Sequence, residues 1–369
     1  MTGVQALVRL PLLRQDLDKK AGLNTAGFIS GYRGSPLGAY DKQLWQERER
    51  LAARNIVFRP GVNEELAADA VWGSQQVGLF PGARFDGVFG IWYGKGPGVD
   101  RAGDALKHAN FFGTSKHGGV LALAGDDHSC KSSTLPNQSD FAFMDAEIPV
   151  LSPADIEDLL EFGLKGFELS RFAGLWVGVK TIADTMDASA TVRIDLKRYR
   201  ALWPDHPLPP SGSRNGRSSR TPPEQEELHR HFRLPAARAF ARVNSFDRTI
   251  VDSPNARLGI VASGKAYLHV MQALRDLGID SQIARSLGLR VYKIGLVWPL
   301  DQDGARAFAS GLETALVVEE RRDVIEHQLR AAAYDLPDGA RPRIIGKKDA
   351  KGAPLISDLM DIDLSLIHI

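Results

Sequence analysis

Short apolar runs alternate with helical segments over residues 25–200, and this alternation constrains the fold more than any other feature. The pattern predicts strands at residues 28–30, 88–92, 119–124, 175–179 and 190–194. It predicts helices at residues 39–55, from residue 63 onward, and at 154–171. Such alternation favours a mainly parallel sheet covered by helices. Ligands of these sheets bind at the carboxyl ends of the strands. Three glycine-rich or polar segments follow strands here, GYRGSPLG (31–38), YGKGPG (93–98) and GDDHS (125–129).

The second half of the chain predicts a smaller unit of the same kind. Residues 201–230 are rich in Pro, Ser, Gly and Arg and lack periodicity, so residues 201–250 are interpreted as a linker or long loop. The basic stretch 214–220 could contact an anion, but a solvated linker is the simpler interpretation. A second α/β domain is predicted at 251–356, with strands at 258–263, 289–294, 314–318 and 343–346 and helices at 265–277 and 322–334.

Composition excludes several classes of protein. Hydrophobic residues make up 43% and charged residues 25% of the 369 residues, which is typical of a globular protein. A formal net charge of +1 disfavours nucleic acid as a partner. No apolar run reaches the roughly 20 residues of a membrane span. The apolar residues of the amino-terminal segment are interrupted by Arg9 and Arg14, so the segment lacks a signal-peptide core. We interpret it as an amphipathic helix of a cytoplasmic protein.

A single cysteine, Cys130, excludes a disulfide framework within this chain. It also excludes an iron–sulfur cluster held by this segment alone, because such clusters need about four thiolates. Cys130 is interpreted as a small loop residue rather than a nucleophile. The last residues, 357–369, follow no pattern and are interpreted as a non-native or truncated tail.

Several segments resemble one known family. GFISGYRGSPLGAYD, GVNEELAADAVWGSQ and GDDHSCKSSTLPNQSD resemble the pyrimidine-binding domain of indolepyruvate:ferredoxin oxidoreductases, particularly the long fused bacterial form. LGIVASGKAYLHVMQAL, VYKIGLVWPLD and ALVVEERRDVIEHQLRAA resemble the transketolase-C-terminal-like domain that follows it. The likeness extends to about residue 356. It implies an α/β fold with a parallel-sheet, pyrimidine-type thiamine-diphosphate-binding domain at 1–200 and the smaller α/β domain at 251–356.

The resemblance implies a thiamine-diphosphate-dependent 2-oxoacid:ferredoxin oxidoreductase. Its members oxidatively decarboxylate an aryl 2-oxoacid such as indolepyruvate, join the acyl group to coenzyme A and reduce ferredoxin. The family's diphosphate-binding domain, its cluster-binding cysteines and its gamma-type domain are missing from this sequence. We therefore expect an N-terminal fragment of a longer chain that also begins upstream of Met1. Magnesium and iron–sulfur clusters are expected only in the absent domains, and a homodimer is expected.

Glu64 is the predicted catalytic and cofactor-binding carboxylate. Thiamine chemistry needs an acid that hydrogen-bonds to the aminopyrimidine ring and sets its tautomer. Asn63 suits the N-cap of a helix, and an acid in the first turn is favoured by the helix dipole. First-turn acids are usually structural, and Glu65 is a local competitor. By resemblance, the glutamate after the Val-Asn pair is the catalytic one, and this residue is Glu64.

The two glycine-rich segments provide further candidates. In GYRGSPLG, the resemblance assigns Ser35 and Arg33 to the substrate carboxylate and Gly34 to the cofactor, whereas the alternative is an ordinary tight turn set by Pro36. In YGKGPG, it assigns Lys95 and Gly96 to the cofactor and, just beyond this segment, Arg101 to the substrate. The spacing does not match a phosphate-binding Walker loop. Lys95 could instead cap a turn.

The GDDHS segment contributes His128 as a candidate proton shuttle, although a hydrogen-bonded surface histidine is equally compatible with the pattern. Asp126 and Asp127 are expected to face solvent, and no metal ligand is assigned. In the second domain, Glu319 and Glu320 end a strand, where they could contact a neighbouring domain, but a charge pair at the start of a helix is the simpler interpretation. Neither residue is assigned a catalytic role.

Three alternatives stay open at this stage. The same chemistry could act on another 2-oxoacid, such as phenylpyruvate or a branched-chain acid. A non-oxidative thiamine enzyme is the second alternative, and cluster-binding cysteines downstream would exclude it. The third is a non-catalytic scaffold or regulatory subunit that keeps the fold, for which Glu64→Gln would leave activity unchanged.

Overall fold

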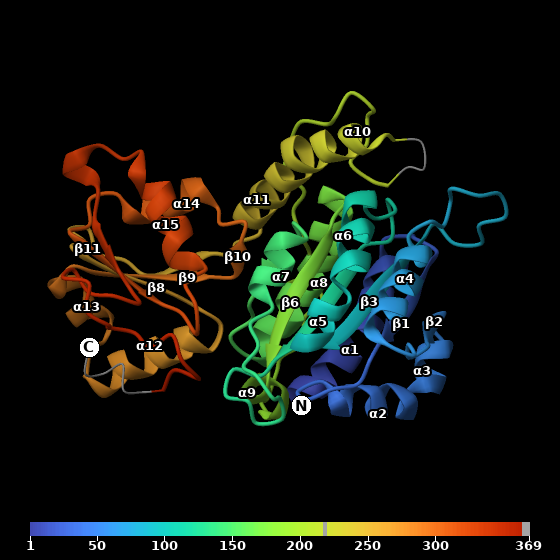
Figure 1. The fold of residues 1–369 in the computed structure, drawn as a ribbon, viewed down its shortest axis with the longest axis horizontal. Helices are drawn as coiled ribbons and strands as arrows, with labels where there is room; N and C mark the ends of the chain where they lie inside the picture. The colour runs from blue at the N-terminus through green and yellow to red at the C-terminus, as the bar shows by residue number, and fades with distance from the viewer. Residues whose placement is uncertain (217–219, 364–369) are drawn as a thin grey trace.

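The computed structural model describes residues 1–216 and 220–363 and contains two sheets, each covered by helices (Figure 1). The larger sheet has seven strands in the order β10-β5-β6-β4-β3-β1-β2. All of its pairings are parallel except β10 with β5. The predicted α/β fold with a mainly parallel sheet is therefore confirmed. Its strands are β1 (Thr25–Gly31), β2 (Ile56–Phe58), β3 (Gly87–Lys95), β4 (Val120–Asp126), β5 (Val150–Leu151), β6 (Trp176–Ile182) and β10 (Leu296–Trp298).

Alternation along the buried strands produces the two cores of this sheet. Leu121 and Leu123 of β4 belong to the apolar cluster that includes α1 and α8, whereas Ala122 and Ala124 belong to the cluster that includes α4 and α6. The sheet is thus covered on both faces, as its apolar strands require. The helices of this unit are α1 (Gly3–Lys20), α2 (Gly38–Gln46), α3 (Arg48–Ala52), α4 (Glu64–Ser74), α5 (Gly96–Arg101), α6 (Gly103–Phe112), α7 (Asp140–Asp145), α8 (Ile156–Ala173) and α9 (Ala183–Asp187).

The second sheet has five strands in the order β12-β11-β8-β9-β7, of which only β7 runs antiparallel to its neighbour. The predicted strands 258–263, 289–294 and 314–318 are confirmed with the same bounds. The elements are β7 (Arg248–Val251), β8 (Leu258–Ser263), α12 (Gly264–Asp276), α13 (Ser281–Leu287), β9 (Leu289–Ile294), α14 (Gln302–Ala309), β11 (Thr314–Val318), α15 (Ile325–Tyr334), the 3-10 turn η2 (Asp338–Ala340) and β12 (Arg343–Ile345).

The region predicted as a linker is partly helical, which corrects the interpretation of residues 201–250. A continuous helix comprises α10 (Pro222–Glu227), the π-helical turn η1 (Leu228–Arg233) and α11 (Leu234–Val243). Phe240 of this helix is fully buried in the core that includes α8. Arg233 is also fully buried, and its guanidinium donates to the carbonyls of Arg214 and Phe111 at 2.7 and 2.8 Å. These contacts come from distant segments, so local composition could not predict them.

Other expectations also need correction. Residues 190–194 form no strand, because no neighbouring strand pairs with them. The helix predicted at 39–55 is divided at Glu47 into α2 and α3. The YGKGPG segment is not a loop, since β3 continues to Lys95 in register with β4 and α5 begins at Gly96. Within the basic stretch 214–220, Arg214 donates to the Phe172 carbonyl at 2.9 Å, and residues 217–219 lie outside the described residues.

The two sheets are joined directly. Strand β10 leaves the second unit and pairs with β5 at the edge of the first sheet. A buried ion pair between Lys293 and Asp158, 2.6 Å long, crosses the same boundary. Among the described residues, none of the helices combines the length and the apolar character needed to cross a bilayer.

Candidate functional site

The segments that follow β1, β3 and β4 meet at the carboxyl edge of the larger sheet, because these three strands are neighbours. A Cβ placed on Gly34 would lie 2.9 Å from the Cβ of Lys95, so these two segments are in direct contact. A Cβ on Gly125 would lie 2.9 Å from Cδ of Pro36. Glycine at these positions therefore permits the close approach of the three segments.

Glu64 occupies the first turn of α4 and lies over the junction between β3 and α5. Asn63 caps the helix by accepting a hydrogen bond from the Leu66 amide at 2.9 Å, as predicted. The indole Nε1 of Trp92 donates to the Glu64 carbonyl at 2.9 Å and fixes the backbone there. A Cβ on Gly98 would lie 2.5 Å from the Glu64 Cγ. Glycine at position 98 therefore provides the space that the Glu64 side chain occupies.

The carboxylate of Glu64 is half-buried and has no hydrogen-bond or ion-pair partner among residues 1–216 and 220–363. Its neighbour Glu65 is exposed. A half-buried acid that the protein itself leaves unpaired is available to a ligand. The role of Glu64 beside an aminopyrimidine ring stays a prediction.

Lys95 and Gly96 join the same edge to the segment that follows β4. The Lys95 Nζ donates to the Ser132 carbonyl at 2.7 Å and to its hydroxyl at 3.1 Å. A Cβ on Gly96 would lie 2.5 Å from the Cβ of Asn137. The structure therefore brings Gly34, Lys95 and Gly96 together, as expected for residues of one site.

Asp126 and Asp127 are buried, so the expectation that they face solvent is wrong. Asp126 accepts hydrogen bonds from the amide and hydroxyl of Ser139, while Asp127 accepts from the amides of Lys131 and Ser132. Burial raises the pKa of Asp126, and the nearby charge of Lys180 opposes that effect. Burial also opposes ionisation of Asp127, but the hydrogen bonds from Ser132 and its neighbours lower its pKa overall. The two acids fix the shape of the segment 127–139, which we call the site loop.

His128 is only 2% exposed and faces the second domain. Its Nδ1 lies 3.1 Å from Oε2 of Glu320, at the end of β11, and 3.7 Å from Oδ1 of Asp361. Its Nε2 lies 3.9 Å from Oδ2 of Asp126. Neither ring nitrogen has an aligned hydrogen-bond partner among the described residues. Of the two interpretations of Glu320, the structure shows the contact with a neighbouring domain, and the role of His128 as a proton shuttle stays a prediction.

A largely buried lysine at the domain boundary was missed from the sequence. Lys180 of β6 pairs with Asp140 at 2.8 Å. Burial disfavours its charge, but Asp140 and Asp126 raise its pKa overall. A small cavity of about 30 Å³ lies between the domains beside Lys180, Lys265 and Glu320. The one available signal was a lysine inside the apolar strand WVGVKTI.

Three predicted substrate residues are not joined to this cluster. Arg33 and Ser35 are exposed in the turn after β1, and Arg101 is exposed at the end of α5. No hydrogen bond or ion pair connects them to Glu64, Lys95 or the site loop within the part of the chain that the structure describes. Their roles stay predictions.

Two solved structures share the fold of this chain. A 2-oxoglutarate:ferredoxin oxidoreductase from Magnetococcus marinus, solved with 2-oxoglutarate, coenzyme A and succinyl-CoA bound, has a similar fold with a TM-score of 0.70 and 16% identity. The match covers 100% of this chain and 64% of that one. An inactive beta4 tetramer of a split-gene transketolase matches with a TM-score of 0.55 and 12% identity over 95% of this chain and 90% of that chain. The chain therefore has the two-domain fold of these enzymes.

The sequence comparisons show a more specific similarity. Residues 247–356 match the indolepyruvate ferredoxin oxidoreductase middle domain. The indolepyruvate oxidoreductase subunit IorA of Methanothermobacter thermautotrophicus is 27% identical over 88% of this chain and 49% of that protein. IorA of Pyrococcus abyssi is 24% identical over 87% and 46%, respectively. The resemblance to thiamine-diphosphate-dependent 2-oxoacid:ferredoxin oxidoreductases is thus confirmed. The chain spans about half the length of these relatives.

Proposed function

We propose that this chain supplies the pyrimidine side of the thiamine diphosphate site in an oxidoreductase that converts an aryl 2-oxoacid, indolepyruvate, into its acyl-CoA and reduces ferredoxin. The observation that carries the proposal is the unpaired, half-buried carboxylate of Glu64 above Gly94 and Gly98. Remaining segments of the whole protein would contribute the diphosphate-binding domain with magnesium, the iron–sulfur clusters and the gamma-type domain. A homodimer in the cytoplasm is part of the same proposal.

The residues around Glu64 suit the group it would hold. Thiamine diphosphate, when bound, supplies the nucleophilic carbon that adds to a 2-oxoacid. The Glu64 carboxyl would hydrogen-bond to a nitrogen of the pyrimidine ring and exchange a proton with it, which sets the tautomer of the ring. Trp92 holds the Glu64 backbone, and glycine at 94 and 98 leaves a floor without side chains below the carboxylate. The protein thus orients the acid before any ligand arrives.

The surrounding residues divide into two further groups in this proposal. Gly34, Lys95 and Gly96 would line the cofactor, since their segments are already packed against one another. Arg33, Ser35 and Arg101 would reach the substrate carboxylate, for which an exposed guanidinium is suited to a bidentate contact. His128 would transfer a proton at the inner end of the site loop.

The decisive experiment replaces Glu64 by Gln in the full-length enzyme. Because general acid–base catalysis contributes about 10²–10⁴-fold, we expect indolepyruvate-dependent reduction of ferredoxin to fall by at least about 100-fold. Glu65→Gln is the matched control, since that exposed side chain is the next residue of the same helix. Its activity should stay within about twofold of wild type.

Unchanged activity of the Glu64→Gln enzyme would contradict the catalytic assignment and favour a scaffold role for this domain. Phenylpyruvate and branched-chain 2-oxoacids, assayed alongside indolepyruvate, would test the substrate. A higher kcat/KM for one of them than for indolepyruvate would correct the substrate while leaving the chemistry intact.

A further inference from the structure

We propose that residues 320–322 of the second domain position the site loop, with Glu320 as the principal positioning residue acting through His128. This inference rests on the proposed function, because the site loop carries the partners of Lys95 and Gly96. Neither Glu320 nor the segment around it would touch the cofactor or the substrate. The second domain would therefore control the geometry of a site to which it contributes no reacting group.

The segment 320–322 contacts the site loop at both of its ends. At the beginning, Oε2 of Glu320 lies 3.1 Å from Nδ1 of His128. At the end, the Arg322 amide donates to Oε1 of Gln138 at 3.1 Å, and the Gln138 amide nitrogen donates back to the Arg322 carbonyl at 3.3 Å. The Arg322 guanidinium also lies 3.7 Å from the ring centre of Phe141, just beyond the loop. Two contacts from one short segment thus hold both ends of a 13-residue loop.

The backbone conformation of residues 320–322 allows both end residues to contact the site loop. Arg321 has a φ of 61°, the left-handed region that non-glycine residues seldom adopt. This conformation lets Glu320 and Arg322 on either side contact the same loop of the first domain. A residue kept in this region is strained unless its surroundings compensate, and such residues concentrate at functional segments.

Glu320 is anchored on a rigid element and is free to attract His128. The preceding Glu319 accepts the amides of Val324, Ile325 and Glu326 and so fixes the start of α15. Lys180 and Lys265, the cations near Glu320, are already paired with Asp140 and Asp184. Oε1 of Glu320 is buried without a hydrogen-bond partner among the described residues. Burial opposes its ionisation, yet His128 and the two lysines lower its pKa overall.

A short series of hydrogen bonds connects the position of the site loop to the position of Lys95. Asp127, next to His128, accepts the amides of Lys131 and Ser132 at 2.9 and 2.8 Å. Ser132 in turn holds the Nζ of Lys95, and Asn137 packs against Gly96. A displacement of His128 would therefore shift the groups that fix Lys95.

The test compares Glu320→Gln with Glu313→Gln in the full-length enzyme. Glu313 precedes the same strand at its opposite end and forms an exposed ion pair with Arg257, so it is a matched control. We expect Glu320→Gln to weaken thiamine diphosphate binding about tenfold and to accelerate tryptic cleavage after the exposed Lys131 in the loop. Glu313→Gln should change neither measurement. In a His128→Gln background, Glu320→Gln should add little, because its partner is already gone.

Equal cofactor affinity and equal cleavage for the Glu320→Gln and Glu313→Gln enzymes would overturn the proposal. The cleavage assay needs no cofactor, so it separates this result from a failure of the proposed function, which Glu64→Gln tests. His128, Glu320 and Asp361 also present ligand atoms within 4.8 Å of one another. Faster cleavage after Lys131 in enzyme treated with EDTA, and its reversal by Zn²⁺, would likewise overturn the direct Glu320–His128 contact, in favour of a metal-held one.

Discussion

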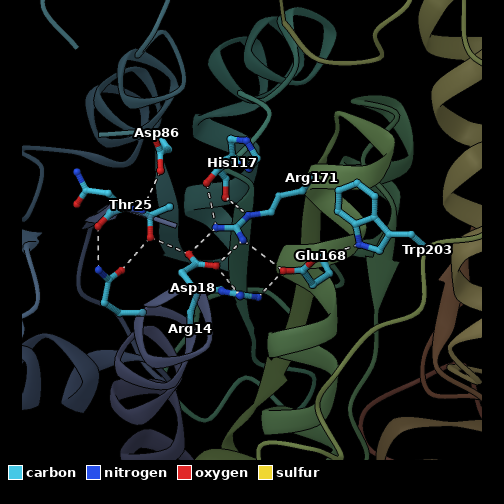
Figure 2. Close-up of polar contacts among 11 residues, drawn as sticks. Arg14, Asp18, Thr25, Asp86, His117, Glu168, Arg171 and Trp203 are labelled. Atoms are coloured by element: carbon cyan, nitrogen blue, oxygen red, sulfur yellow. Dashed lines mark hydrogen bonds and ion pairs between the residues drawn. The ribbon is translucent and has the colours of Figure 1, made fainter. Parts of the chain in front are cut away.

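The two ends of the larger sheet both bury charged side chains, but they differ in how those charges are paired. At the amino end lies a network of Arg14, Asp18, Thr25, Glu168 and Arg171, which we call the basal network (Figure 2). Asp18 accepts from Arg14 at 2.6 Å, from Arg171 at 2.7 Å with each oxygen, and from Thr25 at 2.8 Å. Its carboxylate is therefore saturated by groups of α1, β1 and α8, and the one polar side-chain atom of these five residues that is buried without a partner among the described residues is Nε of Arg14.

The carboxyl end of the same sheet is left incomplete. The carboxylate of Glu64, both ring nitrogens of His128 and one oxygen of Glu320 have no hydrogen-bond partner within the described ranges. Burying unpaired polar groups costs stability, so proteins keep few of them without a reason. The comparison shows that burial of charge alone does not indicate a site. An unsaturated group at a strand end is the more informative signal.

The substitution with the largest expected effect tests whether the basal network is purely structural. Replacing Asp18 by Asn leaves two buried guanidiniums without a full counter-charge, which costs about 3–5 kcal/mol. We expect the free energy of unfolding to fall by that amount, while cofactor affinity of the folded protein stays within twofold. Asp16→Asn is the control, because its ion pair with Arg54 is partly exposed to solvent and contributes about 0–1 kcal/mol. A specific loss of cofactor affinity in the folded Asp18→Asn protein would break the comparison.

Local patterns predicted most of the fold because an apolar run with clear boundaries marks a buried strand. Strands β8, β9 and β11 are apolar runs with clear boundaries, and the sequence predicts their limits to the residue. Residues 190–194 have a similar apolar character, but a strand also needs a partner, and no local pattern supplies one. The helix at 222–243 was missed for the opposite reason. Its burial depends on Arg233 reaching carbonyls of a segment more than 100 residues earlier.

The same distinction applies to the site. Gly34, Glu64 and Lys95 lie at strand–helix junctions of one domain, where sequence and resemblance could place them. The pairing of Lys180 with Asp140 and of His128 with Glu320 depends on tertiary contacts between segments distant in the chain. Asp126 and Asp127 resemble ordinary solvent-exposed acids until their bonds to Ser139 and Ser132 are known.

Asp247 provides a further test of this comparison, because its carboxylate also has an unpaired oxygen but lies away from the carboxyl edge of the larger sheet. Its Oδ1 accepts the amides of Gly295 and Leu296, while Oδ2 is buried without a partner among the described residues. Burial raises its pKa to about 7, against a usual value of about 3.9. Between these values the folded state keeps a proton that the unfolded chain has lost, so stability falls as the pH rises from about 4 to 7.

We therefore expect Asp247→Asn to remove part of this pH dependence. Relative to wild type, the variant should gain about 4 kcal/mol of unfolding free energy at pH 8 and little at pH 4, because the pKa is raised by about three units and each unit corresponds to about 1.4 kcal/mol. Chemical denaturation at both pH values measures the difference. Asp252→Asn is the control, since that carboxylate is exposed in its pair with Arg290. Equal stability differences at the two pH values would show that Asp247 is ionised throughout.

The substitution with the smallest expected effect tests whether the space that Gly98 leaves for the Glu64 side chain matters for activity. In Gly98→Ala, the added methyl group would lie 2.5 Å from the Glu64 Cγ, so the flexible side chain must move. Because a side chain shifts more cheaply than backbone, we expect the melting temperature to change by less than about 3 °C. The carboxylate would leave its position, however, and kcat should fall about tenfold, which corresponds to about 1.4 kcal/mol. Gly103→Ala is the matched control, since a Cβ there meets no atom within 4 Å. If both variants keep full kcat, the space above Gly98 has no part in orienting Glu64. Incomplete pairing at the carboxyl edge would then cease to distinguish it from the basal network.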